Sequence, residues 1–179
     1  MKNSNGKTAN TNRWVIMGVS GCGKSTVGKS LAIARGVGFV EGDEFHPEAN
    51  VIKMTAGIPL SDDDRAGWLG ALQIQIGAAR ECGIGLVVSC SALKRRYRDM
   101  LRLADPGLRF AHLKGSRDLI FSRMQARVGH YMPLSLLDTQ LNVLEALDDD
   151  EAGLCLDINA APDELIAQIL QSEGNALPA

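Results

Sequence analysis

The sequence has little of several features that mark specialised classes of protein. Aromatic residues make up 4% of the 179 residues, and the formal net charge is −2 at pH 7. A chain with no large excess of positive charge is not expected to bind nucleic acid. No apolar run approaches the ~20 residues that a membrane-spanning helix requires, so no membrane partner is expected either.

Cysteine is equally scarce, since the chain has only Cys22, Cys82, Cys90 and Cys155. Their spacing matches neither a paired zinc-ligand pattern nor a redox Cys-x-x-Cys motif. We therefore expect reduced, structural thiols and a cytoplasmic location. Residues 1–12 are polar and lack the apolar centre of a signal peptide, and we expect them to form a disordered tail.

What the sequence does contain is an alternation of short apolar runs with longer segments of helical spacing. Its length fits one domain, expected over residues 13–175. The apolar runs predict strands at 14–18, 38–42, 84–90, 109–114 and 152–159. The periodic segments predict helices at 24–35, 62–82, 93–103, 116–127 and 162–171. Such alternation implies crossover connections, so we predict an α/β fold with a mainly parallel, five-stranded sheet.

A glycine-rich segment directly follows the first predicted strand and opens the first predicted helix. It matches the phosphate-loop pattern Gly-x4-Gly-Lys-Ser and reads Gly18-Val19-Ser20-Gly21-Cys22-Gly23-Lys24-Ser25. Glycines let several backbone N–H groups converge on a phosphate, and the helix N-terminus attracts the same charge. We predict that these residues and Thr26 bind a nucleotide, that Lys24 reaches its β- and γ-phosphates, and that Ser25 ligates Mg²⁺. The loop alone does not separate a kinase from a GTPase or another ATPase.

Two charged residues are expected near this loop. Asp43 follows the second predicted strand, and ligands of open α/β sheets bind beyond the carboxyl ends of strands. A carboxylate there can orient an acceptor hydroxyl and accept its proton, although a solvated loop aspartate is the alternative. Arg65 stands at a predicted helix start, where a cation opposes the helix dipole. Either it grips an anionic substrate, or it forms a salt bridge with the neighbouring aspartates, at least one of which caps the helix.

Basic residues recur in two further segments. Lys94, Arg98 and Arg102 are four residues apart and share one helix face. Lys94, nearest to the strand end, is the candidate anion ligand, and the other two are expected to be solvated surface charges. Arg123 and Arg127 are also four apart. We expect them on a segment that closes over ATP, where one brings positive charge to the transferred phosphate and one stacks on adenine.

A longer pattern resembles one known family. It reads Gly42-Asp43-x-x-His46-Pro47-x-x-Asn50-x-x-Lys53-Met54-x-x-Gly57-x-Pro59-Leu60-x-Asp62-Asp63-Asp64-Arg65. Two further stretches extend it, Cys90-Ser91-Ala92-Leu93-Lys94-x-x-Tyr97-Arg98-Asp99 and Arg123-Met124-x-Ala126-Arg127-x-Gly129-His130. Together they resemble the bacterial thermoresistant, P-loop type of gluconokinase over residues 13–170.

The resemblance implies transfer of the γ-phosphate of ATP to O6 of D-gluconate, with Mg²⁺ as cofactor and a homodimer as the assembly. It implies a fold similar to that of nucleoside monophosphate and shikimate kinases, with a lid around residues 123–137. The candidate catalytic residues are then Lys24, Asp43 and Arg127. The candidate gluconate ligands are Asp43, His46, Arg65 and Lys94, and Arg123 is the candidate neighbour of adenine.

The sequence departs from that family at two places. Gly67 stands where the family usually has proline in the first helical turn, which is expected to loosen that turn by about 1 kcal/mol or less. No aspartate follows the third predicted strand, so we expect Mg²⁺ to be held by Ser25, phosphates and water, with Asp43 helping through water. Shikimate or a nucleoside monophosphate is the alternative acceptor. A nucleotide-driven switch is the alternative class, although no Asp-x-x-Gly motif directly follows the third predicted strand and the chain has no Asn-Lys-x-Asp motif for guanine.

Overall fold

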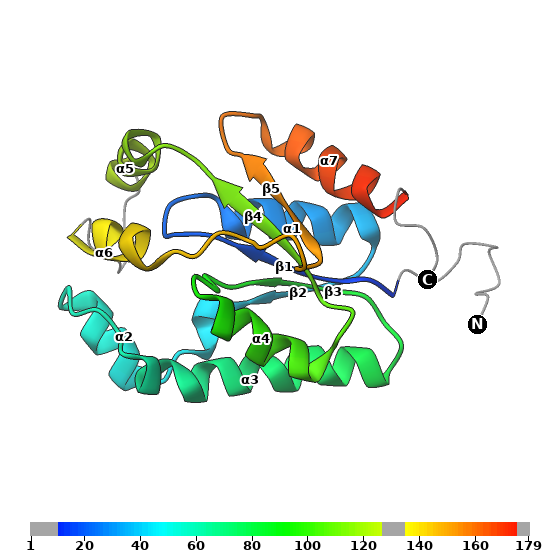
Figure 1. The fold of residues 1–179 in the computed structure, drawn as a ribbon, viewed down its shortest axis with the longest axis horizontal. Helices are drawn as coiled ribbons and strands as arrows, with labels where there is room; N and C mark the ends of the chain where they lie inside the picture. The colour runs from blue at the N-terminus through cyan, green and yellow to red at the C-terminus, as the bar shows by residue number, and fades with distance from the viewer. Residues whose placement is uncertain (1–10, 127–134, 175–179) are drawn as a thin grey trace.

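A five-stranded parallel sheet forms the centre of the structure, a computed structural model that describes residues 11–126 and 135–174 (Figure 1). The strand order is β2-β3-β1-β4-β5. The strands are β1 (Arg13–Met17), β2 (Gly38–Glu41), β3 (Leu86–Ser89), β4 (Arg109–Lys114) and β5 (Gly153–Asp157). All four strand pairings are parallel, as the sequence predicts. The carboxyl ends of the strands therefore meet at one edge of the sheet.

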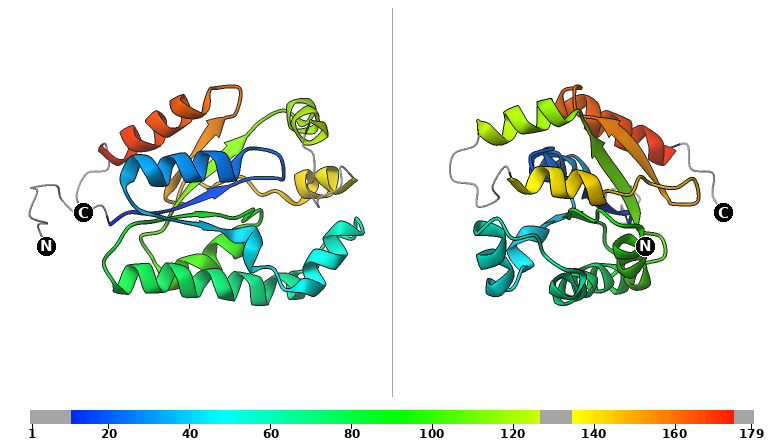
Figure 2. Two further views of the ribbon diagram at one scale, coloured as in Figure 1. Left: turned by 180° about the vertical axis from the view of Figure 1, so that it is seen from behind. Right: turned by 60° about the vertical axis from the view of Figure 1, so that its left-hand side comes forward.

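Helices cover both faces of this sheet. Helices α1, α5 and α7 lie on one side and α3 and α4 on the other, while α2, α5 and α6 gather toward one end of the molecule (Figures 1 and 2). The helices are α1 (Lys24–Arg35), the short 3₁₀ helix η1 (Gly42–Phe45), α2 (Glu48–Thr55), α3 (Asp62–Glu81), α4 (Arg95–Ala104), α5 (Arg117–Gln125), α6 (Ser135–Val143) and α7 (Pro162–Gly174). Within the described residues, no helix combines the length and the hydropathy needed to cross a bilayer.

Strand β1 separates two hydrophobic clusters. Trp14 and Ile16 face one cluster, with residues of α1 and α7, and Val15 and Met17 face the other, with residues of α3 and α4. This division follows from the alternation of side chains along a strand. All four side chains are fully buried. The phosphate-loop sequence begins at the next residue, Gly18, directly after these four buried residues.

The sequence predicts α1 and β4 with the observed bounds, but it misses α2 and α6. Both helices are short, with eight and nine residues, and each has only two buried positions. So few buried positions leave little apolar periodicity in the sequence. Most of the expected tail, residues 1–10, and part of the expected lid, residues 127–134, lie outside the described residues.

Arg98 is not the solvated surface charge that the sequence suggests. Its side chain is completely buried and forms two hydrogen bonds with the buried carboxylate of Glu151, with Nε–Oε1 and Nη2–Oε2 distances of 2.7 and 2.6 Å. The guanidinium also donates to the carbonyls of Glu145 and Ala146. Burial acts to raise the pKa of Glu151, but hydrogen bonds from Arg98, the Asp148 N–H and Arg102 lower that pKa to about 2. Helical spacing did not reveal this because the partner lies 53 residues further along the chain.

Glu151→Gln is expected to destabilise the protein because it leaves the Arg98 charge buried without a counter-charge. The free energy of unfolding should fall by about 3–5 kcal/mol, as measured by urea denaturation. Asp138→Asn is the matched control, since it breaks the exposed Arg117–Asp138 pair (2.6 Å) and should change stability far less. Equal losses in the two variants would contradict a structural role for the buried pair.

Candidate active site

The phosphate loop connects β1 to α1 and leaves the N-terminus of α1 open. Gly23, the residue before the helix, has φ +101°, and a Cβ placed on it would meet nothing within 4 Å. Gly21 has φ +81°, and a Cβ there would lie 2.4 Å from the side chain of Met124. Gly23, the N-cap residue, has no side chain that could cap the start of α1. Because backbone N–H groups at a helix N-terminus attract anions, this end of α1 suits a phosphate.

The side chains of the loop divide into two groups. Those of Val19 and Cys22 are buried in the core, and burial raises the pKa of the Cys22 thiol, so these two residues have only their backbone to offer a nucleotide. Lys24 instead folds back over the loop and donates from Nζ to the Val19 carbonyl at 3.1 Å. Ser25 and Thr26 follow it in the first turn of α1.

The acceptor candidates meet at one hollow beside this loop. Lys24, Asp43, His46 and Arg65 all line it, although they come from α1, η1, the η1–α2 turn and α3. The other lining residues are Ser20, Met54, Leu60, Trp68, Ser91, Leu93 and Gln140. The structure therefore brings together four residues that the sequence assigned to the reaction.

His46 is held as a neutral imidazole. Its ring stacks on Trp68 with 4.2 Å between centroids and 17° between planes, and its Nδ1 lies 3.4 Å from the Asn50 amide nitrogen. Burial lowers the pKa of His46 to about 4, against the opposing effect of the Asp43 charge. A neutral imidazole can both donate and accept hydrogen bonds. It is therefore better suited to bind a sugar hydroxyl than to bind a substrate carboxylate.

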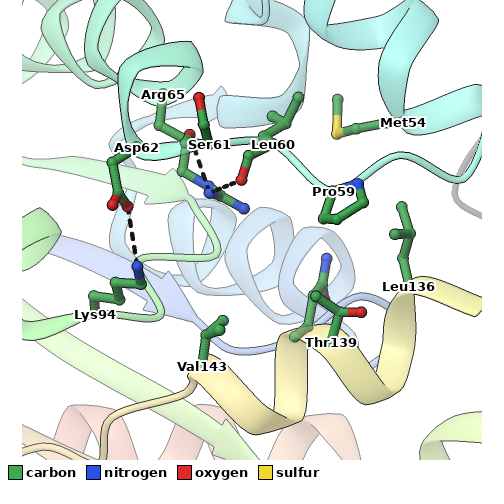
Figure 3. A pocket seen from close by; sticks show the side chains of 11 residues that line it. Met54, Pro59, Leu60, Ser61, Asp62, Arg65, Lys94, Leu136, Thr139 and Val143 are labelled. Atoms are coloured by element: carbon green, nitrogen blue, oxygen red, sulfur yellow. Dashed lines mark hydrogen bonds and ion pairs between the residues drawn. The ribbon is translucent and has the colours of Figure 1, made fainter.

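Arg65 is held by carbonyl groups rather than by its aspartate neighbours. Its Nη1 donates to the carbonyl oxygens of Leu60 and Ser61, the latter at 3.2 Å (Figure 3). Within the described residues it forms no ion pair with Asp62, Asp63 or Asp64, so that alternative is wrong. Asp64 instead completes the capping box of α3, whose N-cap is Ser61: the Ser61 N–H donates to Asp64 Oδ2 at 2.8 Å, and the Asp64 N–H donates to the Ser61 hydroxyl at 3.1 Å.

Lys94 borders an adjoining hollow, shown in Figure 3, together with Asp62, Arg65 and Gln140. Its Nζ lies 3.0 Å from Asp62 Oδ1. The pKa of Asp62 is lowered chiefly by the Tyr97 hydroxyl and then by Lys94 and Arg96, which all contact its carboxylate. The other residues of this hollow are Met54, Pro59, Leu60, Ser61, Leu136, Thr139 and Val143.

A third hollow lies beside the phosphate loop and the first turns of α1. Its lining includes Gly21, Thr26 and Arg123, together with Cys22, Gly23, Val27, Ile158, Ala160, Pro162 and Leu165. Arg123 is anchored there by a 2.8 Å hydrogen bond from Nη2 to the Ile158 carbonyl. The other arginine of the expected lid, Arg127, lies outside the described residues.

The described part of the chain contains no cluster of three or more His, Cys, Asp or Glu residues that could hold a metal ion. At the end of β3, the Ser89 hydroxyl accepts from the Gly42 N–H at 3.1 Å and donates to Glu41. Glu41 thus places a carboxylate beside the end of β3, the strand that no aspartate follows.

Sequence reasoning misses three residues of the acceptor hollow whose side chains can form hydrogen bonds: Trp68, Ser91 and Gln140. Trp68 lies within a predicted helix that gives no sign of a site residue, but its Nε1 donates to the Gly42 carbonyl at 2.7 Å, beside Asp43. Ser91 stands inside the family-like pattern and was assigned no role. Gln140 lies on α6, which no sequence signal indicated.

A proton NMR titration is expected to give His46 a pKa of about 4, well below its ordinary value of 6.5. Between these two values the unfolded chain binds a proton that the folded chain does not, so stability should fall as the pH drops from 6.5 to 4. His46→Gln assigns the signal, since His112 is also buried and also has a lowered pKa of about 4. A His46 pKa near 6.5 would show that the ring is solvated.

No family model matches the chain, but individual proteins of known function are similar to it. The chain is 44% identical over 157 residues to a gluconokinase of Gluconobacter oxydans (strain 621H), covering 88% of each. It is 41% identical over 159 residues to the thermoresistant gluconokinase of Escherichia coli (strain K12), covering 88% of this chain and 91% of the relative.

Solved structures also include a gluconokinase that is similar to this chain. The crystal structure of a gluconokinase from Sinorhizobium meliloti 1021 matches with a TM-score of 0.83 and 43% identity, over 93% of this chain and 94% of that one. A shikimate kinase from Aquifex aeolicus matches in fold alone, with a TM-score of 0.58 and 18% identity over 93% and 99% of the two chains. With the P-loop kinase fold and this degree of identity over most of its length, the chain belongs to the gluconokinase family.

Proposed function

We propose that the protein transfers the γ-phosphate of ATP to O6 of D-gluconate and so produces 6-phospho-D-gluconate. The observation that carries the proposal is that Lys24 of the phosphate loop lines the same hollow as Asp43 and Arg65. A site for a phosphate donor and a site for an anionic polyol therefore adjoin. Membership of the gluconokinase family supports gluconate as the acceptor.

The phosphate loop fits the triphosphate of ATP. The uncapped N-terminus of α1 offers backbone N–H groups, and Lys24 offers a charge that now rests on a loop carbonyl. Ser25 is assigned as the side chain that would ligate Mg²⁺, with Asp43 helping through water. When bound, Mg²⁺ neutralises negative charge on the phosphates.

Asp43 is the group that handles the proton. As the O6 hydroxyl attacks the γ-phosphorus, the bond from that phosphorus to the β–γ bridging oxygen breaks and ADP leaves. The hydroxyl proton passes to the Asp43 carboxylate, and Lys24 stabilises negative charge on the transferred phosphoryl group. Both residues line the hollow in which the acceptor would lie.

The acceptor carboxylate is assigned to Arg65 and Lys94. Both hydrogen bonds that Arg65 forms in the described residues use Nη1, so Nη2 and Nε remain as donors for a carboxylate. Lys94 has three donors and its described hydrogen bond, to Asp62, uses one. His46, neutral and stacked on Trp68, is assigned to the sugar hydroxyls.

Several finer features belong to the same proposal. Residues 13–175 are assigned to one kinase domain, and Arg127, which lies outside the described residues, is assigned to the transferred phosphate. Arg123, beside the third hollow, lies against the adenine. The enzyme works as a cytoplasmic homodimer.

The direct test is an ADP-release assay with Mg-ATP and a panel of acceptors. Turnover is expected with gluconate and not with shikimate, AMP or neutral hexoses. Neutral hexoses lack the carboxylate assigned to Arg65 and Lys94, and membership of the gluconokinase family favours gluconate over the other two anions. Turnover with another acceptor would keep the phosphate chemistry and refute the assignment of gluconate. ATP binding without any acceptor-dependent turnover would favour a nucleotide switch.

Asp43→Asn is expected to lower kcat by about 10²–10⁴-fold, because the amide cannot accept the hydroxyl proton. ATP affinity, measured by calorimetry, should stay within about twofold, since the phosphate loop is unchanged. Asp63→Asn is the matched control, as this exposed aspartate lines none of the hollows described above. Near-normal turnover of Asp43→Asn would remove this residue from the mechanism.

A further inference from the structure

Helix α6 brings a side chain directly onto the phosphate loop. The backbone N–H of Ser20 donates to Oε1 of Gln140 at 2.7 Å, across 120 residues of sequence. In a phosphate loop, backbone N–H groups normally point toward the bound phosphates. Gln140 therefore reaches the place where the donor phosphate and the acceptor come together.

Gln140 also connects the two hollows on the acceptor side. It lines the one that contains Lys24, Asp43 and His46, and it lines the adjoining one that contains Lys94. Arg65, Met54 and Leu60 are the other residues common to both. An acceptor that extends from the carboxylate ligands to the phosphate loop would pass this side chain.

The chemistry of a carboxamide differs from that of the other polar groups around it. Lys24, Arg65 and Lys94 are cations, which recognise anionic groups and discriminate poorly among neutral hydroxyls. A carboxamide has an accepting oxygen and an NH₂ group with two donors, and it carries no charge. With its oxygen fixed by the Ser20 N–H, the side chain is held in one orientation before substrate binds.

We propose that Gln140 is a specificity-determining residue that hydrogen-bonds an acceptor hydroxyl through its NH₂ group and holds the acceptor against the phosphate loop. This inference rests on the proposed function. Gln140 and the neutral His46 form hydrogen bonds with the hydroxyls of the polyol, while Arg65 and Lys94 bind its carboxylate.

The alternative is that Gln140 only ties α6 to the loop, and three variants separate the two roles. Gln140→Met removes all hydrogen bonding at nearly constant length. Gln140→Glu keeps an oxygen for the Ser20 N–H but loses the NH₂ donors. Asn142→Asp makes the same change from amide to carboxylate at an exposed position of the same helix, and so controls for added charge.

Gluconate and ATP kinetics are measured for these variants and for the wild type. We expect both Gln140 variants to raise the KM for gluconate by roughly tenfold, the effect of losing one or two hydrogen bonds, with the KM for ATP within about twofold of wild type. Asn142→Asp should match the wild type in both constants.

Every other pattern overturns the inference. An effect of Gln140→Met with a normal Gln140→Glu would show that only the tie to Ser20 matters, and an effect of Gln140→Glu alone would show only charge repulsion. Equal rises in both KM values would indicate a deformed phosphate loop, and normal constants throughout would leave Gln140 without a role. If wild type and Asn142→Asp fail to turn over gluconate, the proposed function itself fails.

Discussion

Strand β1 lies between β3 and β4, with a hydrophobic cluster on each face, and its residues from Trp14 to Met17 are 0% exposed. A one-residue shift of this strand would exchange the two faces, so its register is strongly determined. Since the neighbouring strands run parallel to it, their carboxyl ends stop at the same edge. The phosphate loop, Asp43 and the loop before Lys94 all begin at that edge, and the active site depends on this placement.

The cations of the site are anchored mostly by neutral groups. Lys24 rests on a carbonyl of its own loop, and Arg65 rests on the carbonyls of Leu60 and Ser61. Carbonyl partners orient these side chains without cancelling their charge, so the hollow keeps a surplus of positive charge for two anionic substrates. Because burial lowers the pKa of His46, its imidazole is neutral at pH 7 and contributes hydrogen bonds rather than charge.

A buried ion pair connects this region with the chain that follows α6. Arg98 binds Glu151 and the carbonyls of Glu145 and Ala146, just beyond the end of α6 at Val143. The Glu145 N–H also donates to the Leu93 carbonyl at 2.8 Å, next to Lys94. These contacts join the C-terminal end of α6 to the loop between β3 and α4. Gln140 and Lys94, which line the same hollow, are thereby held by one framework.

Local sequence patterns were sufficient to predict the fold class and the phosphate loop of this protein. The alternation of apolar runs and helical segments predicted a parallel five-stranded sheet, and Gly-x4-Gly-Lys-Ser predicted the phosphate loop, because both depend on residues close in sequence. Contacts between distant segments decided the rest. The burial of Arg98 and the neutral state of His46 follow from packing. The bond from Ser20 to Gln140 spans 120 residues. Residue spacing carries no information about such pairs, since only the folded chain brings them within hydrogen-bonding distance.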